Sequence, residues 1–146
     1  MADIAVIGLG VIGGAVLKEL SKKVKVTGVD ISQDILNSFK SEGYTVVPKL
    51  ETPQDVYIVC TYSTESVIAV VRNLDYSRKP LVVIESTTKP GTHGILEEIV
   101  VKNNKSNLLI FPHRFNPNDP EHHVFNLNRV IGGATPECIK RGVEFY

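Results

Sequence analysis

A glycine-rich turn near residue 10 constrains the fold of this chain more than any other feature. Residues Gly8–Gly13 read Gly-Leu-Gly-Val-Ile-Gly and match the pattern G-x-G-x-x-G. The match follows a short apolar run, Ile4–Ile7, and opens a segment with helical periodicity, Val11–Ser21. In such a strand–turn–helix unit the first glycine permits the tight turn, the second admits a pyrophosphate, and the third allows close helix packing. A glycine-rich turn without a ligand is the alternative, but strand, helix and spacing together favour a dinucleotide site.

The rest of the chain alternates short β-branched runs with longer segments of helical period. We expect strands at Ile4–Ile7, Val24–Val29, Thr45–Val47, Val56–Cys60, Leu81–Ile84, Leu108–Phe111 and Arg129–Ile131. We expect helices at Val11–Ser21, Gln33–Ser41, Glu65–Leu74, His93–Asn103 and Pro136–Tyr146. Strands that are nearly all apolar are typical of parallel sheets covered on both faces. The sequence therefore predicts an α/β fold, a doubly wound, mostly parallel Rossmann-type sheet, as one dinucleotide-binding domain over residues 1–146.

Helix starts are marked by capping residues. Ser32 is placed to cap the second helix, while Thr52-Pro53 and Thr135-Pro136-Glu137 each set a hydroxyl before a first-turn proline. The connection Pro48–Pro53 is compatible with a helical turn or an irregular crossing. The long stretch Pro112–Asn128, rich in Pro, Asn, Asp and His, is compatible with a functional loop or a plain surface loop.

Composition excludes several classes of partner. Sixteen Lys plus Arg balance sixteen Asp plus Glu, which argues against a nucleic-acid or anionic-membrane partner because such affinities need excess positive charge. No apolar run approaches the roughly 20 residues of a spanning helix. Two distant cysteines, Cys60 and Cys138, give no disulfide framework, and no secretion signal opens the chain. We therefore expect a cytoplasmic protein.

An acidic residue follows the glycines at the spacing of a ribose-binding carboxylate. Asp30 closes the second expected strand about 20 residues beyond the glycine pattern. NAD is favoured over NADP, because a carboxylate repels a 2′-phosphate and no arginine follows closely. The alternative role is a loop acid that caps the next helix, and both roles can coexist.

Three further strand ends are expected at the same edge of the sheet, where ligands of doubly wound folds bind. They carry Cys60–Ser63, Glu85–Thr88 and Pro112–Phe115, whose polar groups suit a nicotinamide ribose and a substrate as well as ordinary loop hydrogen bonds. The predicted cofactor-binding residues are Gly8, Gly10, Val11, Ile12, Gly13, Asp30, Ile31, Cys60, Thr61, Ser63 and Thr87.

Specific segments resemble the N-terminal NAD-binding domain of the UDP-glucose/GDP-mannose 6-dehydrogenase family. The resemblance covers nearly the whole chain. Besides the glycine turn it is carried by Val29-Asp30, Asp55–Cys60, Glu85–Thr92 and Asn128–Glu137. The Ser-Thr-x-x-Pro-Gly-Thr and Arg-Val-Ile-Gly-Gly segments in this order are more specific than the glycine motif, which many dehydrogenases share.

The resemblance implies an enzyme that oxidises the C6 hydroxyl of a nucleotide sugar to a carboxylate with two NAD molecules in succession. By position, Thr87 resembles the hydroxyl that positions a catalytic water, and Ser63 a loop residue near the cofactor. His113 stands where the family commonly has the glutamate of Pro-Glu-Arg, so an imidazole replaces the carboxylate expected to assist the water. Tyr62 and Thr64 stand where the family commonly has prolines.

Other implied parts have no counterpart in this chain. Arg114 and Arg129 match arginines of the corresponding segments, but the family's nucleophilic cysteine, a catalytic lysine and the nucleotide-sugar pocket come from later segments. We interpret Cys60 as an ordinary buried thiol rather than a substitute nucleophile, and expect no metal at His113, His122 and His123. The chain would then work with a substrate half on another segment or polypeptide, and homo-oligomerisation is compatible with it.

Two other hypotheses remain open. One is a non-catalytic module that binds NAD or another nucleotide as a sensor or assembly partner. The other is the cofactor domain of a prephenate-dehydrogenase-like enzyme, to which Gly8–Gly14 and the Pro-His after Phe111 are similar. That second resemblance leaves Ser86–Thr92 and Arg129–Glu137 unexplained.

Overall fold

A seven-stranded sheet forms the centre of the computed structural model, which describes residues 2–146. Its strands are β1 (Ile4–Ile7), β2 (Val26–Val29), β3 (Val46–Val47), β4 (Val56–Val59), β5 (Leu81–Ile84), β6 (Asn107–Ile110) and β7 (Gly132–Gly133). They are ordered β3-β2-β1-β4-β5-β6-β7. All neighbouring pairs are parallel except β6 and β7. The strand order reverses between β1 and β4, which creates the crevice where doubly wound folds bind ligands.

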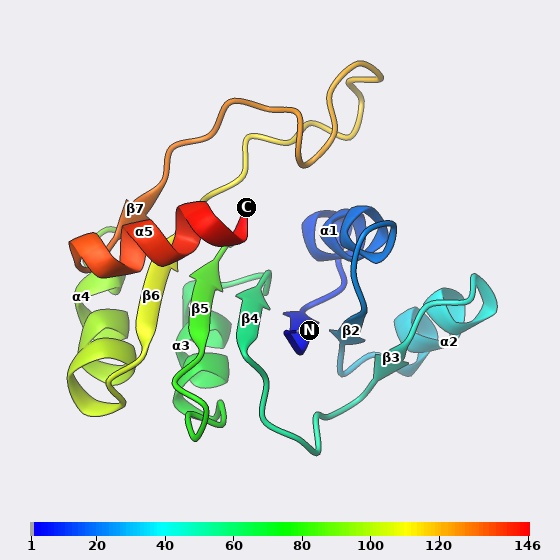
Figure 1. The fold of residues 1–146 in the computed structure, drawn as a ribbon. Coiled ribbons are helices and arrows are strands. Elements are labelled where there is room, and N and C mark those ends of the chain that lie inside the picture. Colours follow the sequence, from blue (N-terminus) through cyan, green and yellow to red (C-terminus); the bar gives the residue numbers. More distant parts are fainter. Residues whose placement is uncertain (1) are drawn as a thin grey trace.

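Helices cover both faces of the sheet (Figure 1). They are α1 (Val11–Ser21), α2 (Gln33–Ser41), α3 (Thr64–Arg72), α4 (Thr92–Glu97) with its wider-turned continuation η1 (Glu98–Asn103), and α5 (Pro136–Phe145). Side chains of α1, α2 and α5 pack with one face of the strands, and those of α3, α4 and η1 with the other. The predicted doubly wound α/β fold is confirmed. None of the helices described for residues 2–146 is long and apolar enough to cross a membrane.

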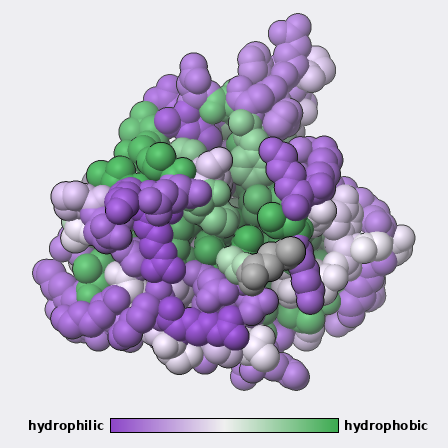
Figure 2. Space-filling view, in the orientation of Figure 1, coloured by the Kyte–Doolittle hydropathy of each residue, from purple (hydrophilic) through white to green (hydrophobic). Residues whose placement is uncertain are grey.

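Successive side chains of each strand point to opposite faces of the sheet, and they build two separate cores. Val6 and Ile58 pack on the α1 face, whereas Ala5, Tyr57 and Val59 pack on the α3 face. Strands with both faces buried need apolar residues at every position, which explains the uninterrupted β-branched runs. In Figure 2 apolar side chains gather in the hollow beneath the segment that joins β6 to β7, and hydrophilic ones surround them.

Two glycines bring α1 against the sheet. Gly8 has a φ of +90°, and a Cβ there would lie 2.8 Å from the carbonyl oxygen of Cys60 at the end of β4. A Cβ at Gly13 would overlap the carbonyl oxygen of Gly8. Only glycine fits either position, and the resulting contact directs the start of α1 at the crevice.

Several expected bounds differ from the structure, and two of the differences have a clear local cause. The second strand begins at Val26 rather than Val24, because the Val24 amide still bonds to the Leu20 carbonyl at the end of α1. No helix begins at Thr52-Pro53. The Thr52 carbonyl accepts from the Gln54 side chain instead, and Asp55 already pairs with Asp3 as the chain enters β4.

The last strand is also displaced from its expected position. Gly132–Gly133 pair with Ile110 and Leu109, and Arg129–Ile131 form no strand. The Arg129 side chain bonds to the carbonyl of Phe111, so a side chain rather than a ladder holds this stretch. A Cβ at Gly133 would lie 2.6 Å from the Ile139 side chain, so the glycine lets α5 approach the sheet edge.

We predict that Gly13→Ala lowers the free energy of unfolding by about 3 kcal/mol, because the added methyl would meet backbone that cannot move aside. Gly10→Ala is the matched control, since a Cβ there meets nothing within 4 Å. It should cost about 1 kcal/mol or less. Urea unfolding followed by circular dichroism measures both, and equal losses would contradict the packing argument.

Candidate functional site

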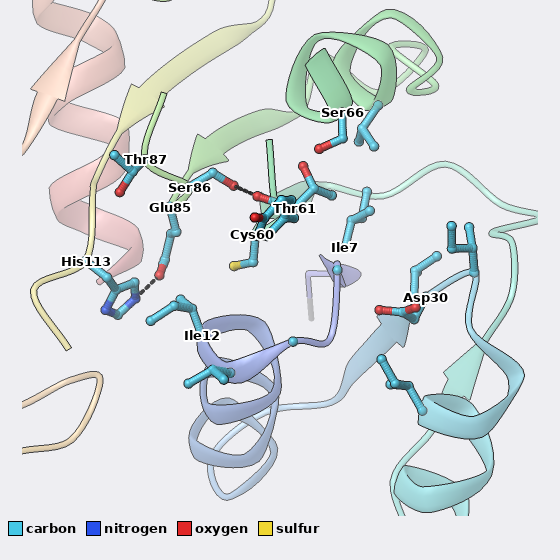
Figure 3. A pocket seen from close by; sticks show the side chains of 18 of the residues that line it. Ile7, Ile12, Asp30, Cys60, Thr61, Ser66, Glu85, Ser86, Thr87 and His113 are labelled. Atoms are coloured by element: carbon cyan, nitrogen blue, oxygen red, sulfur yellow. Dashed lines mark hydrogen bonds and ion pairs between the residues drawn. The ribbon is translucent and has the colours of Figure 1, made fainter. Parts of the chain in front are cut away.

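A cavity of about 780 Å³ opens at the carboxyl ends of β1, β2, β4 and β5. It lies at the reversal of strand order and is lined by residues that follow each of these strands (Figure 3). The volume falls within the range of about 300–1,000 Å³ usual for small-molecule sites.

The first turn of α1 supplies an anion-binding surface in this cavity. The helix begins after Gly10, and no side chain of residues 2–146 caps it. Its first intrahelical bond runs from the Gly14 amide to the Gly10 carbonyl, at 2.8 Å. The amides of the first turn are therefore available, and the first turn has no acidic residue to compete for them. Free amides and the helix dipole together favour a phosphate.

Asp30 links the glycine turn to the loop after β2. One carboxylate oxygen accepts from the Leu9 amide at 2.7 Å, and the other accepts from the Ser32 amide at 2.8 Å. The cap of α2 is Ser32, whose hydroxyl accepts from Ile35, so Asp30 does not cap the helix. A carboxylate has about four acceptor positions, which leaves lone pairs for ribose hydroxyls.

Most of the residues predicted to bind the cofactor lie at this one cavity. Those that line it are Gly8, Gly10, Val11, Ile12, Asp30, Ile31, Cys60, Thr61 and Thr87. Gly13 lies behind the turn, where it packs α1 on the strand. Ser63 is outside the lining: it is the N-cap of α3, and its hydroxyl exchanges hydrogen bonds with Ser66.

A buried ionic cluster closes one end of the cavity. Glu85, directly after β5, has no exposed side-chain surface and is bonded to His113 through Nε2. The Tyr146 hydroxyl donates to the other oxygen of Glu85. Arg129 lies 3.2 Å from the carboxylate and stacks over the Phe111 ring, 3.5 Å from its centroid. Glu85 thus joins β5 to three segments that are distant in sequence.

This cluster could be predicted only in part from the sequence. Glu85 and His113 were expected at strand ends, but nothing predicted that they pair with Arg129 and Tyr146. A charged residue directly after the apolar run Leu81–Ile84 is the feature that marks Glu85, since a buried carboxylate requires partners.

Polar atoms without partners point to a ligand at the same end. Thr61 Oγ1, His113 Nδ1 and Arg129 Nη1 are buried and have no hydrogen-bond partner within residues 2–146. Thr61 and His113 both line the cavity. Unpaired buried polar groups are costly, so a bound polar group that pairs with them would be stabilised.

The thiol of Cys60 is poorly suited to attack a substrate. Burial raises the pKa of Cys60 well above its ordinary value, and the nearby Glu85 carboxylate raises it further. The thiolate is the nucleophilic form, so at neutral pH this cysteine stays protonated. The structure thus favours the interpretation of Cys60 as a buried thiol.

The cavity has the parts that a dinucleotide requires. Free helix amides face its middle, a carboxylate follows β2, and unpaired polar atoms lie beside Glu85. The open space at Gly10, where a Cβ would meet nothing, lets a pyrophosphate approach the backbone.

Comparison with known proteins identifies the family. A family model described as the UDP-glucose/GDP-mannose dehydrogenase family, NAD binding domain, matches residues 50–146. This chain belongs to that family. The TrkA-N domain model matches residues 4–56, the stretch with the glycine turn. NAD is accordingly the cofactor of this domain, as the sequence predicted.

Relatives agree with this assignment. UDP-N-acetyl-D-glucosamine 6-dehydrogenase of Pseudomonas aeruginosa is 26% identical over 98% of this chain, which covers 42% of that protein. UDP-N-acetyl-D-mannosamine dehydrogenase of Campylobacter jejuni is also 26% identical over 98% of the chain, which covers 46% of it. The chain therefore spans less than half the length of these curated relatives.

Solved structures share the fold. A UDP-D-ManNAc dehydrogenase from Pyrococcus horikoshii matches 99% of this chain with a TM-score of 0.78 and 23% identity, and 44% of that chain is covered. A putative oxidoreductase from Mycobacterium avium matches 99% with a TM-score of 0.82 and 19% identity, and 53% of that chain is covered. At these identities the likeness concerns the Rossmann-type fold alone.

We predict that Glu85→Ala lowers the free energy of unfolding by about 3–5 kcal/mol, because it leaves the buried Arg129 charge without its carboxylate. Glu65→Ala is the control. Its ion pair with Lys89 is fully exposed, so the unfolding midpoint should hardly change. Urea denaturation of both variants checks this, and similar midpoints would show that the Glu85 cluster adds nothing to stability.

Proposed function

We propose that this chain is the cofactor-binding half of an enzyme that oxidises the C6 hydroxyl of a UDP-sugar with NAD. The observation that carries the proposal is one cavity that holds the glycine turn, Asp30, Thr87 and His113 in a chain of this family. The substrate half would lie on a segment or polypeptide outside residues 1–146, since the curated relatives are more than twice as long.

In this proposal the glycine turn and the α1 amides hold the pyrophosphate, and Asp30 accepts from the adenosine ribose hydroxyls. Thr61 and Cys60, at the end of β4, border the nicotinamide portion. NAD supplies the hydride acceptor when bound. The Asp30 carboxylate would also reject the 2′-phosphate of NADP.

Thr87 and His113 are the candidate catalytic residues at the far end of the cavity. Thr87 is exposed there, and its hydroxyl can donate and accept at once, which suits it to hold a water or a sugar hydroxyl. His113 is bonded to Glu85 through Nε2, and its Nδ1 has no partner. An imidazole oriented by a carboxylate is suited to take up a proton.

Further parts of the proposal concern the surroundings of the domain. A nucleotide sugar would bind beside Thr87 together with the substrate half. The exposed apolar side chains Ile139 and Val143 on α5 support assembly into a homo-oligomer or against that half. Both cysteines, Cys60 and Cys138, are unpaired, which supports a reducing, cytoplasmic location.

We predict that calorimetric titration detects NAD binding to residues 1–146, with NADP at least about tenfold weaker. Asp30→Ala should lower the affinity for NAD by about tenfold or more, because charged hydrogen bonds to the ribose are lost. Asp34→Ala, an exposed acid in the first turn of α2, is the matched control and should bind as the wild type does. Absence of binding to either nucleotide would remove the basis of the proposal.

The substrate half is tested separately, by following NADH absorbance with a panel of UDP- and GDP-sugars. We predict no turnover by residues 1–146 alone, and turnover of a UDP-sugar once a protein that supplies the substrate half is added. Thr87→Ala should then lower the turnover rate without weakening NAD binding. Thr88 does not line the cavity, so Thr88→Ala is the control and should change neither the rate nor NAD binding. NAD binding with no turnover in any mixture would favour a non-catalytic module.

A further inference from the structure

The hydroxyl of Tyr146 reaches the polar end of the cavity from a segment that does not line it. Tyr146 follows α5, and its ring packs on Phe111 and Phe145, with ring centroids 4.6 and 4.9 Å away. Its hydroxyl bonds to Oε1 of Glu85. In Figure 1 this end of the chain, marked C, lies beside the tip of β5, the strand that Glu85 follows. The end of α5 therefore contributes a polar group to a site built at the strand ends.

The direction of this hydrogen bond follows from the protonation state of the phenol. Burial raises the pKa of Tyr146 well above its ordinary value, and the Glu85 carboxylate raises it further. The phenol is therefore protonated at neutral pH, and its hydroxyl donates to Oε1.

The other oxygen of Glu85 also faces a donor. Nη2 of Arg129 lies 3.2 Å from Oε2, and a guanidinium has no acceptor. Both oxygens of Glu85 are therefore acceptors, one toward a phenol and one toward a guanidinium. The hydrogen of the remaining bond, between Oε2 and Nε2 of His113, must then belong to the imidazole.

This bond decides the tautomer of His113. A neutral imidazole has one donor nitrogen and one acceptor nitrogen, and the bond made by one nitrogen sets the role of the other. With its hydrogen on Nε2, the ring keeps a lone pair on Nδ1. That atom is buried and has no hydrogen-bond partner within residues 2–146. The tautomer thus suits a ligand group that donates a hydrogen bond, such as a water or a sugar hydroxyl.

Tyr146 is the contact that holds the carboxylate in this orientation. Among the bonds within residues 2–146, Oε1 accepts from Tyr146 alone, whereas Oε2 faces both His113 and Arg129. A carboxylate turns about its last carbon–carbon bond, and donors on its two oxygens fix that rotation. Loss of the phenol hydroxyl would free Oε1 and let the Glu85 carboxylate turn away from the imidazole.

We propose that Tyr146 is a positioning residue, which holds Glu85 so that His113 keeps its hydrogen on Nε2 and offers Nδ1 as an acceptor. This rests on the proposed function, in which His113 takes up a proton at this end of the cavity. His113 stands where the family resemblance leads one to expect glutamate. A carboxylate has no tautomers, so control of a ring tautomer is a requirement of this chain.

NMR of the whole chain labelled with ¹⁵N-histidine tests the proposal directly. The ¹⁵N frequency of a ring nitrogen depends strongly on whether it carries a hydrogen, so the tautomer can be read from the two resonances. Mildly alkaline buffer favours the neutral ring. The chain has four histidines, and the signals of His113 are those lost in His113→Gln. We expect the Nε2–H form in the wild type.

Tyr146→Phe removes the hydroxyl and keeps the ring that packs on Phe111. The ratio of the Nε2–H form to the Nδ1–H form of His113 should fall by roughly fivefold, which corresponds to the loss of one ordinary hydrogen bond. Tyr76→Phe is the matched control, because it removes another partly buried phenol hydroxyl, which bonds to the Val71 carbonyl outside the cavity. It should lower the urea midpoint by a similar amount and leave the His113 signals unchanged.

The outcomes separate the role of Tyr146 from the proposed function. A wild type with its hydrogen on Nδ1 would overturn the proposal, as would a tautomer ratio that is the same in Tyr146→Phe as in the wild type or that changes equally in Tyr76→Phe. Tyr146 does not line the cavity, so Tyr146→Phe should bind NAD in calorimetry as the wild type does. A wild type that binds neither NAD nor NADP would overturn the proposed function, and the tautomer ratio would still decide whether Tyr146 positions His113.

Discussion

Close contact between backbones at the glycine turn is the constraint on which the rest of the structure depends. Gly8 turns with a positive φ against the carbonyl of Cys60, and Gly13 lets α1 rest on the Gly8 carbonyl. Side chains at these positions would push the helix away from β1 and β4 and turn its first amides away from the crevice. The same contact therefore fixes the packing of the first strand–helix unit and aims the anion-binding end of α1, so stability and cofactor binding share one cause.

A second constraint acts at the other end of the cavity and depends on charge rather than on close backbone approach. Glu85 continues an apolar strand into the interior, where an isolated carboxylate would be strongly destabilising. Arg129, His113 and Tyr146 satisfy it from three segments that are distant in sequence. The segment between β6 and β7 carries two of these partners, so the cluster ties this long connection to the carboxyl edge of the sheet (Figure 1).

Local patterns predicted much of this architecture. The apolar runs predicted the bounds of β1 and β5 correctly, and the glycine turn and Asp30 lie at one cavity, as expected.

Errors arose where a distant contact overrode a local preference. Arg129–Ile131 has the composition of a strand, but the Arg129 side chain bonds to the Phe111 carbonyl and the ladder forms at the glycines that follow. Ser63, which the family resemblance places near the cofactor, lies outside the cavity lining and caps α3 with its hydroxyl. The Glu85 cluster was not predicted as a unit, because pairings across 28 to 61 residues leave no periodic signal.

The surroundings of Glu85 limit which group of this cluster can exchange a proton. Burial and the nearby Glu85 carboxylate raise the pKa of Cys60 and of Tyr146, so both stay protonated at neutral pH. Glu85 is already held by the guanidinium of Arg129, the imidazole of His113 and the hydroxyl of Tyr146. Among the described residues of this cluster, His113 is left with a ring nitrogen, Nδ1, that has no hydrogen-bond partner. An imidazole in the place of the glutamate expected from the family resemblance therefore keeps a proton acceptor at this end, and it avoids a second carboxylate beside Glu85, where two like charges would repel.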